Sequence, residues 1–172
     1  MRTWWMVEAA AALVLVAGLA FFLLSRRDPG PVPAAAGGGF RGEYFAGREF
    51  RGTPRIQVDP ELDFRWPAGE GPIPGAGDVY CIRWSGRIRP LRSGTHTFRT
   101  RNDDGVRMRV NGKLVVDDWN ARLVVAENRG SIELEAGRLY ELTLEYFNSG
   151  DLGLLQVTWA GPGEPERLLT GE

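Results

Sequence analysis

From residue 40 onward, apolar and polar residues alternate with a period of two, the pattern of strands that bury one face. The alternation comes in separate short runs rather than in one continuous stretch. Their inward members are Tyr80, Ile82 and Trp84; His96, Phe98 and Thr100; Val106, Met108 and Val110; Ile132 and Leu134; Tyr140, Leu142, Leu144 and Tyr146; and Leu155, Val157 and Trp159. The pattern therefore predicts a domain built of strands.

Turn residues separate these runs. They are Arg92-Ser93-Gly94, Asn111-Gly112 and Glu135-Ala136-Gly137, and Asn-Gly is a favoured corner of a tight β-hairpin. Short strands at this spacing predict an all-β sandwich or barrel over residues 40–172. His96 takes an inward strand position, so we expect it to be a packed core residue rather than a catalytic base.

A different pattern occupies the N-terminus. Residues 4–24 are apolar except for Glu8, and as a helix they would reach about 31 Å, enough to cross a bilayer core. Residues typical of membrane interfaces mark the two ends: Trp4 and Trp5, then Arg26 and Arg27. We expect residues 1–27 to form a transmembrane signal anchor, in which Glu8 snorkels to the interface or pairs with a partner helix.

A cleaved signal peptide is the alternative, because Ala34 and Ala36 offer a small-residue cleavage pattern. That site lies well beyond the apolar run, behind two arginines and three prolines, so an uncleaved anchor is favoured. Residues 28–39 are rich in Pro, Ala and Gly and predict a linker. The positive charges of Arg2 on one side and Arg26 and Arg27 on the other leave the orientation open.

Composition narrows the function. The chain has 172 residues, a charged fraction of 25% and a net charge of -1, which suits one folded domain and lacks the basic field of a nucleic-acid binder. Cys81 is the single cysteine and His96 the single histidine, so neither an intrachain disulfide nor a multi-His zinc site is available.

The most informative segment is Arg101-Asn102-Asp103-Asp104-Gly105, where two adjacent carboxylates and a glycine interrupt two strands. A solvated turn would explain it as well as a binding site would. Catalysis by this pair is not expected, because adjacent residues of one turn cannot flank a glycosidic bond from opposite sides. We expect no enzyme activity.

Over residues 40–169 the chain resembles the PA14 domain family, the β-module of anthrax protective antigen, bacterial glycosidases and fungal adhesins. The resemblance is carried by 40–45 (FRGEYF), 63–66 (DFRW), 82–86 (IRWSG), 94–98 (GTHTF), 103–107 (DDGVR), 111–117 (NGKLVVD), Trp119, 144–148 (LEYFN) and Trp159. It implies a PA14-type β-barrel or sandwich. His96 departs from the family's usual bulky aromatic.

In lectin-like PA14 domains, two aspartates joined by a cis peptide bond hold Ca²⁺, which binds sugar hydroxyls. The resemblance places that pair at Asp103 and Asp104, the side-chain ligand at Asn148, and two carbonyl ligands at Gly150 and Leu152. Asp151 would add a carboxylate to the ion or bind a sugar hydroxyl. The loop from Asn148 to Leu154 is short, so the implied pocket is shallow.

These expectations combine into a membrane-anchored module that binds glycans in a Ca²⁺-dependent way. PA14 domains typically work outside the cytoplasm, which implies a single-pass protein of a bacterial membrane with its domain periplasmic or extracellular. The alternative is a structural or assembly subunit, whose helix and domain bind protein partners in a membrane complex.

Overall fold

The computed structural model describes residues 38–172, and all its regular elements there are β-strands. Within that range no helix could cross a membrane. The predicted anchor of residues 1–27, Glu8 within it, and most of the predicted linker lie outside the described residues. Gly39 donates its N–H to the carbonyl oxygen of Gly171 at 3.2 Å.

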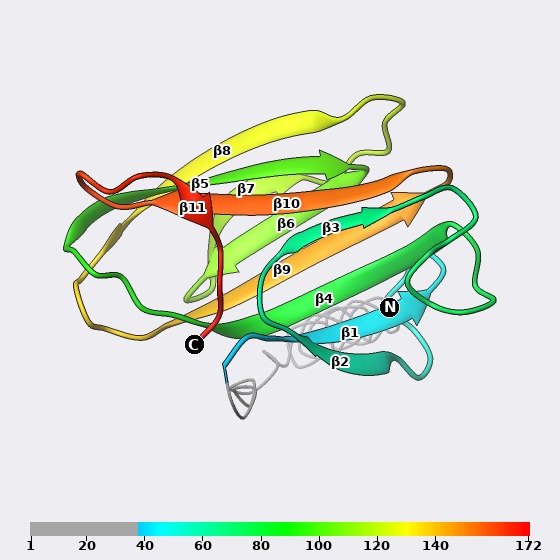
Figure 1. The fold of residues 1–172 in the computed structure, drawn as a ribbon, viewed down its shortest axis with the longest axis horizontal. Coiled ribbons are helices and arrows are strands. Elements are labelled where there is room, and N and C mark those ends of the chain that lie inside the picture. The colour runs from blue at the N-terminus through cyan, green and yellow to red at the C-terminus, as the bar shows by residue number, and fades with distance from the viewer. Residues whose placement is uncertain (1–37) are drawn as a thin grey trace, which may run out of the picture. The chain divides into compact units, whose positions relative to one another are not determined.

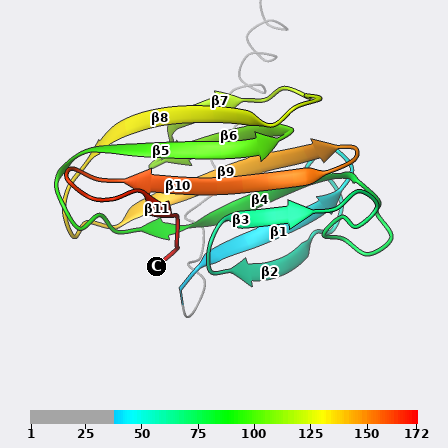
Figure 2. The same cartoon turned by 45° about the horizontal axis from the view of Figure 1, so that its top comes forward.

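Two antiparallel sheets pack face to face (Figures 1 and 2). The six-stranded sheet has the order β2-β1-β4-β9-β6-β7, with β1 Phe40–Ala46, β2 Arg55–Asp59, β4 Val79–Ile88, β6 Gly105–Val110, β7 Lys113–Asp118 and β9 Tyr140–Ser149. The five-stranded sheet has the order β11-β10-β5-β8, with β5 Gly94–Asp103, β8 Ala126–Leu134, β10 Gly153–Ala160 and β11 Arg167–Leu168. Its remaining strand, β3 Asp63–Trp66, also pairs with β10.

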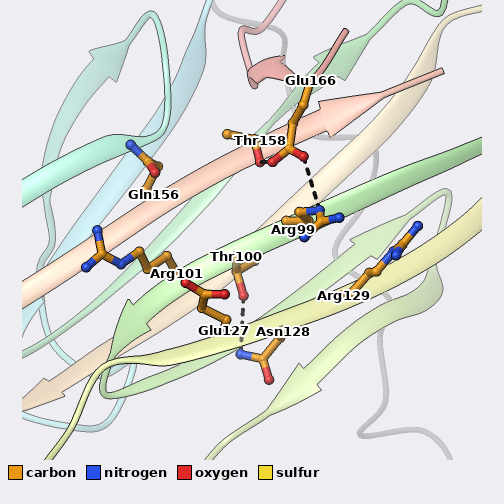
Figure 3. Close-up of a pocket in the computed structure, with 9 residues that line it drawn as sticks. All are labelled: Arg99, Thr100, Arg101, Glu127, Asn128, Arg129, Gln156, Thr158 and Glu166. Carbon is orange, nitrogen blue, oxygen red and sulfur yellow. Dashed lines mark hydrogen bonds and ion pairs between the residues drawn. The ribbon is translucent and has the colours of Figure 1, made fainter. Parts of the chain in front are cut away.

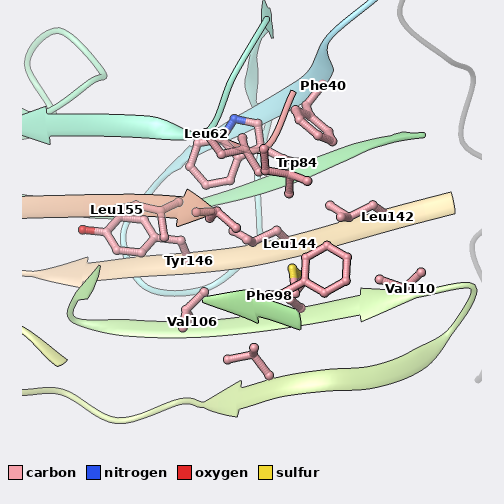
Figure 4. Close-up of a cluster of buried hydrophobic side chains, with 14 of the residues drawn as sticks. Phe40, Leu62, Trp84, Phe98, Val106, Val110, Leu142, Leu144, Tyr146 and Leu155 are labelled. Atoms are coloured by element: carbon pink, nitrogen blue, oxygen red, sulfur yellow. The ribbon is translucent and has the colours of Figure 1, made fainter. Parts of the chain in front are cut away.

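Each alternating run of the sequence lies within a strand, and the all-β prediction is confirmed. The inward residues of both sheets form one apolar core, part of which Figure 4 shows around Trp84, Phe98 and Tyr146. His96 is a fully buried part of this interior, with its ring 5.4 Å from that of Trp159 and its Nδ1 3.0 Å from the Gly94 carbonyl oxygen. Its prediction as a packed residue is confirmed.

A second, smaller apolar cluster lies on the opposite face of the six-stranded sheet. Its buried members are Phe45, Cys81 and Phe147, and Phe50 and Trp119 pack against them. The rings of Trp119 and Phe147 meet edge to face at 4.7 Å. Trp119 directly follows β7, so this contact fixes the start of the loop that runs from there to β8.

Candidate functional site

The two predicted aspartates lie where the chain passes from one sheet to the other. Asp103 ends β5, Gly105 begins β6, and the peptide bond between Asp103 and Asp104 is cis, as the resemblance implied. A Cβ atom at Gly105 would lie 2.2 Å from the Phe147 ring. Glycine is therefore required directly after the aspartates, because the backbone there lies against an aromatic ring of β9.

The Asp104 carboxylate is buried, with 2% of the residue exposed, and it binds two separate segments. Its Oδ1 accepts the backbone N–H of Arg122. Its Oδ2 accepts the backbone N–H and the hydroxyl of Ser149, at 2.8 and 2.5 Å. A carboxylate has about four lone-pair sites, and these three bonds leave one of them, on Oδ1.

Asn148 directly precedes Ser149 on the chain and is fully buried. Its Nδ2 donates to the carbonyl oxygens of Asp78 at 2.9 Å and Gly150 at 3.2 Å. These two bonds aim the amide and leave its Oδ1 without a hydrogen-bond partner among the described residues. A buried acceptor without a donor costs free energy, and a cation at this oxygen would remove that cost.

The structure places Asn148 in a strand, whereas the sequence analysis placed it in the loop after the strand. β9 continues to Ser149 because the ladder with β4 continues, with Asn148 opposite Tyr80 and Ser149 opposite Val79. The loop before β10 therefore contains only Gly150, Asp151 and Leu152. A side chain on a strand is held more firmly than one on a loop.

Asp103 is half-buried, and its carboxylate makes no hydrogen bond or ion pair with residues 38–172. Burial raises the pKa of this carboxyl above its ordinary 3.8, and the negative charges of Asp104 and Asp151 raise the pKa further. Its backbone is fixed instead, since the hydroxyl of Tyr146 donates to the Asp103 carbonyl oxygen. Asp103 is thus a free carboxylate in a locally negative site.

The three-residue loop after β9 approaches the same place. Gly150 contributes the carbonyl oxygen that Asn148 bonds, and the exposed Asp151 adopts a left-handed backbone conformation with φ 55°. Its charge is near enough to act on the pKa of Asp103. Leu152, half-buried, ends the loop one residue before β10.

These groups are oxygen donors, the type that Ca²⁺ prefers. Residues 38–172 contain no cluster of three or more His, Cys, Asp and Glu side chains arranged to hold a metal. Any ion here therefore depends on two carboxylates supplemented by amide and carbonyl oxygens. The unpartnered Asn148 Oδ1 and the single remaining lone pair of Asp104 fit such a mixed set.

Residues to which the sequence pattern assigned no role support the pair. Asn102, buried, donates from Nδ2 to the Asp104 carbonyl oxygen at 2.6 Å. Asn128 on β8 donates from its own Nδ2 to the Asn102 Oδ1 at 3.0 Å. Arg122 reaches Asp104 from a loop 18 residues further along the chain, and its side chain bonds Asp118 on β7.

Asp118 anchors this Arg122 loop. Burial acts to raise the pKa of its carboxyl, but hydrogen bonds from Arg122 and Asn120 and the positive charge of Arg122 outweigh burial and hold that pKa below its ordinary value. Asp118 therefore stays ionised and keeps the Arg122 segment against the aspartate pair.

Comparison with known proteins agrees with the family resemblance seen in the sequence. A family model described as PA14 domain matches residues 37–170. The anti-sigma-I factor RsgI3 of Acetivibrio thermocellus is 33% identical over 133 residues, which is 77% of this chain and 20% of the relative. The chain thus spans about a fifth of that relative's length.

Solved structures show the same fold. An anti-sigma factor domain-containing protein from Clostridium clariflavum has a TM-score of 0.72 and 34% identity, covering 78% of this chain and 45% of that one. A PA14 sugar-binding domain from an RTX adhesin has a TM-score of 0.63 and 19% identity, covering 78% of this chain and 96% of that one. The second likeness concerns the fold alone.

Proposed function

This chain belongs to the PA14 domain family, and on that premise we propose that it is an extracytoplasmic, membrane-anchored module that binds glycans through Ca²⁺. The observation that carries the proposal is the buried Asn148 Oδ1, which has no hydrogen-bond partner within residues 38–172. Asn148 directly precedes Ser149, which binds the Asp104 carboxylate. Ca²⁺ would be a suitable partner for the Asn148 oxygen, because it accepts carboxylate, amide and carbonyl oxygens in flexible geometry.

Each residue has a distinct part in the proposed site. Asp103 supplies the free carboxylate, Asp104 supplies its remaining Oδ1 lone pair, and Asn148 supplies its buried amide oxygen. The carbonyl oxygens of Gly150 and Leu152 complete the protein's contribution. When bound, Ca²⁺ would leave open coordination positions for two neighbouring hydroxyls of a sugar.

Asp151 is proposed to contact the sugar rather than the ion. It is exposed, at the tip of a three-residue loop, and its carboxylate can accept a hydrogen bond from a sugar hydroxyl. Because this loop is so short, we expect a shallow pocket beside it. A shallow pocket suits the terminal or exposed units of a glycan, and selectivity then depends on the surface around the ion.

The membrane part of the proposal rests on the apolar segment of residues 4–24 in the sequence. A tethered module that faces outward would hold glycans at the cell surface or report their presence. We propose a binding role rather than catalysis, because adjacent residues of one turn cannot flank a glycosidic bond from opposite sides.

A panel of immobilised glycans, probed with the purified protein in Ca²⁺ and again in chelator, tests this function. We expect retention on a subset of glycans in Ca²⁺ and release in chelator. Asp151→Asn should weaken retention, whereas Asp117→Asn, an exposed acid on β7, should not. Retention that survives chelation, or that is absent from every glycan, contradicts the proposal.

A further inference from the structure

A cavity of about 350 Å³ lies on the five-stranded sheet, away from the apolar core (Figure 3). Strands β5, β8 and β10 supply most of its lining. The lining residues are Arg99, Thr100, Arg101, Glu127, Asn128, Arg129, Gln156, Thr158 and Glu166. Three are arginines and two are glutamates, so the lining carries a formal charge of 3 − 2 = +1, in a protein whose overall charge is -1.

The arginines are arranged in a way that packing alone does not favour. Arg99 on β5 and Arg129 on β8 are directly opposite one another in the antiparallel ladder, where like charges are destabilising. Glu166 neutralises Arg99 from the other side, with its Oε2 3.1 Å from the Arg99 Nε. Arg129 has no such acid, since no carboxylate of residues 38–172 lies within ion-pair distance of it.

Arg101, like Arg129, has no ion-pair partner among residues 38–172. It is exposed, and Glu127 is its cross-strand partner. In Figure 3 the side chains of Arg101 and Arg129 extend away from each other, toward opposite ends of the cavity. Two guanidinium groups can therefore bind anions at separate points along one surface.

This surface adjoins the candidate ion site. Arg101 and Asp103 are two residues apart on β5 and face the same side of the sheet, so their Cα atoms are about 7 Å apart. Across the ladder, Gln156 is opposite Arg101 and Leu154 is opposite Asp103. A ligand bound at Asp103 that continues along β5 would meet Arg101 first.

We infer that the glycan is acidic, with uronate carboxylates bound by Arg101, beside the ion, and by Arg129, further along the same surface. This inference deepens the proposed function and rests on it. Arginine binds carboxylates with two parallel hydrogen bonds, and a polyuronate carries a carboxylate on every sugar, which suits two separated arginines. A cation at Asp103 would neutralise the carboxylate that repels a uronate most closely. The ion and the arginines would therefore both favour binding of an acidic glycan.

The test compares two oligosaccharides of equal length and linkage, one made of glucuronic acid and one of glucose, which differ only at C6, a carboxylate in the first and a hydroxymethyl group in the second. Calorimetry in Ca²⁺ measures both affinities for the wild-type protein and for Arg101→Gln/Arg129→Gln. Arg138→Gln is the control, because this exposed arginine bonds Glu135 in the turn between β8 and β9. The rise in Tm with Ca²⁺ is recorded for each protein.

We expect the wild type and the control to bind the glucuronate oligomer at least about tenfold more tightly than the glucose oligomer, a preference that added salt weakens. The double variant should lose this preference and keep its Ca²⁺-dependent rise in Tm. Equal affinity for the two oligomers in the wild type, or a preference retained in the double variant, overturns the inference alone. No rise in Tm and no binding of either oligomer overturns the proposed function, and the inference with it.

Discussion

Ser149 donates both its backbone N–H and its hydroxyl to one carboxylate oxygen of Asp104, at 2.8 and 2.5 Å. The other oxygen accepts the backbone N–H of Arg122. One buried carboxylate therefore joins the end of β9 to the loop before β8. Asp104 has a structural role in addition to its proposed role as an ion ligand. Substitution of Asp104 would therefore affect stability and ion binding together.

Ser149→Ala separates these roles, because it removes the hydroxyl and keeps the backbone donor. We expect the free energy of unfolding to fall by about 1.5–3 kcal/mol, the range for a hydrogen bond to a charged group. Urea denaturation measures this change. Ser131→Ala, which removes an exposed hydroxyl bonded to Thr97, should change stability by less than about 0.5 kcal/mol. Equal effects of the two substitutions would contradict the account.

Gly105→Ala tests the close contact behind the aspartate pair. The added Cβ would lie 2.2 Å from the Phe147 ring, so we expect a loss of about 1–3 kcal/mol from overpacking. In the double variant Gly105→Ala/Phe147→Leu, the smaller side chain makes room, and the total loss should be less than the sum of the two single losses. Strict additivity would show that the ring is not the obstacle.

Cys81 reports on the cluster that holds Trp119. Burial raises the pKa of its thiol from 9.0 to about 11, and the thiolate is the reactive form. Stability from the buried neutral thiol is complete below pH 9 and is lost as the pH rises through about 11. At pH 8 we expect a thiol reagent to label the native protein only as fast as it unfolds.

Trp119→Ala uncovers this cluster, so labelling of Cys81 should become faster at the same pH. The loop that bears Arg122 begins at this tryptophan. Faster labelling of Cys81 would therefore indicate that the start of this loop has also loosened. Rapid labelling of the wild-type protein at pH 8 would contradict the buried environment of Cys81.

The sequence predicted strands well where a single face is buried, as in Tyr140, Leu142 and Leu144 of β9. It did not identify β1, because Tyr44 and Phe45 are both buried, one in the main core and one in the smaller cluster. Such double burial removes the alternation on which the prediction depends. β2, β3 and β7 likewise lacked a clear period of two.

The candidate site was predictable in part. The family motif located Asp103 and Asp104, and the loop after β9 was placed near them. Arg122 carried no signal, because its backbone N–H is what binds Asp104, and any residue type supplies that group. Arg101 and Arg129 were also missed, since their juxtaposition depends on the register between β5 and β8.

The most direct test of the central claim is calorimetric titration of the protein with Ca²⁺, for the wild type and for Asp103→Asn. Because the Asp103 carboxylate makes no hydrogen bond or ion pair within residues 38–172 and has a raised pKa, this substitution should leave the ion-free protein folded and no less stable. Asp117→Asn serves as the control. The account predicts saturable Ca²⁺ binding in the wild type and the control, with affinity at least about tenfold lower in Asp103→Asn. No binding to the wild type, or equal affinity in all three proteins, would contradict it.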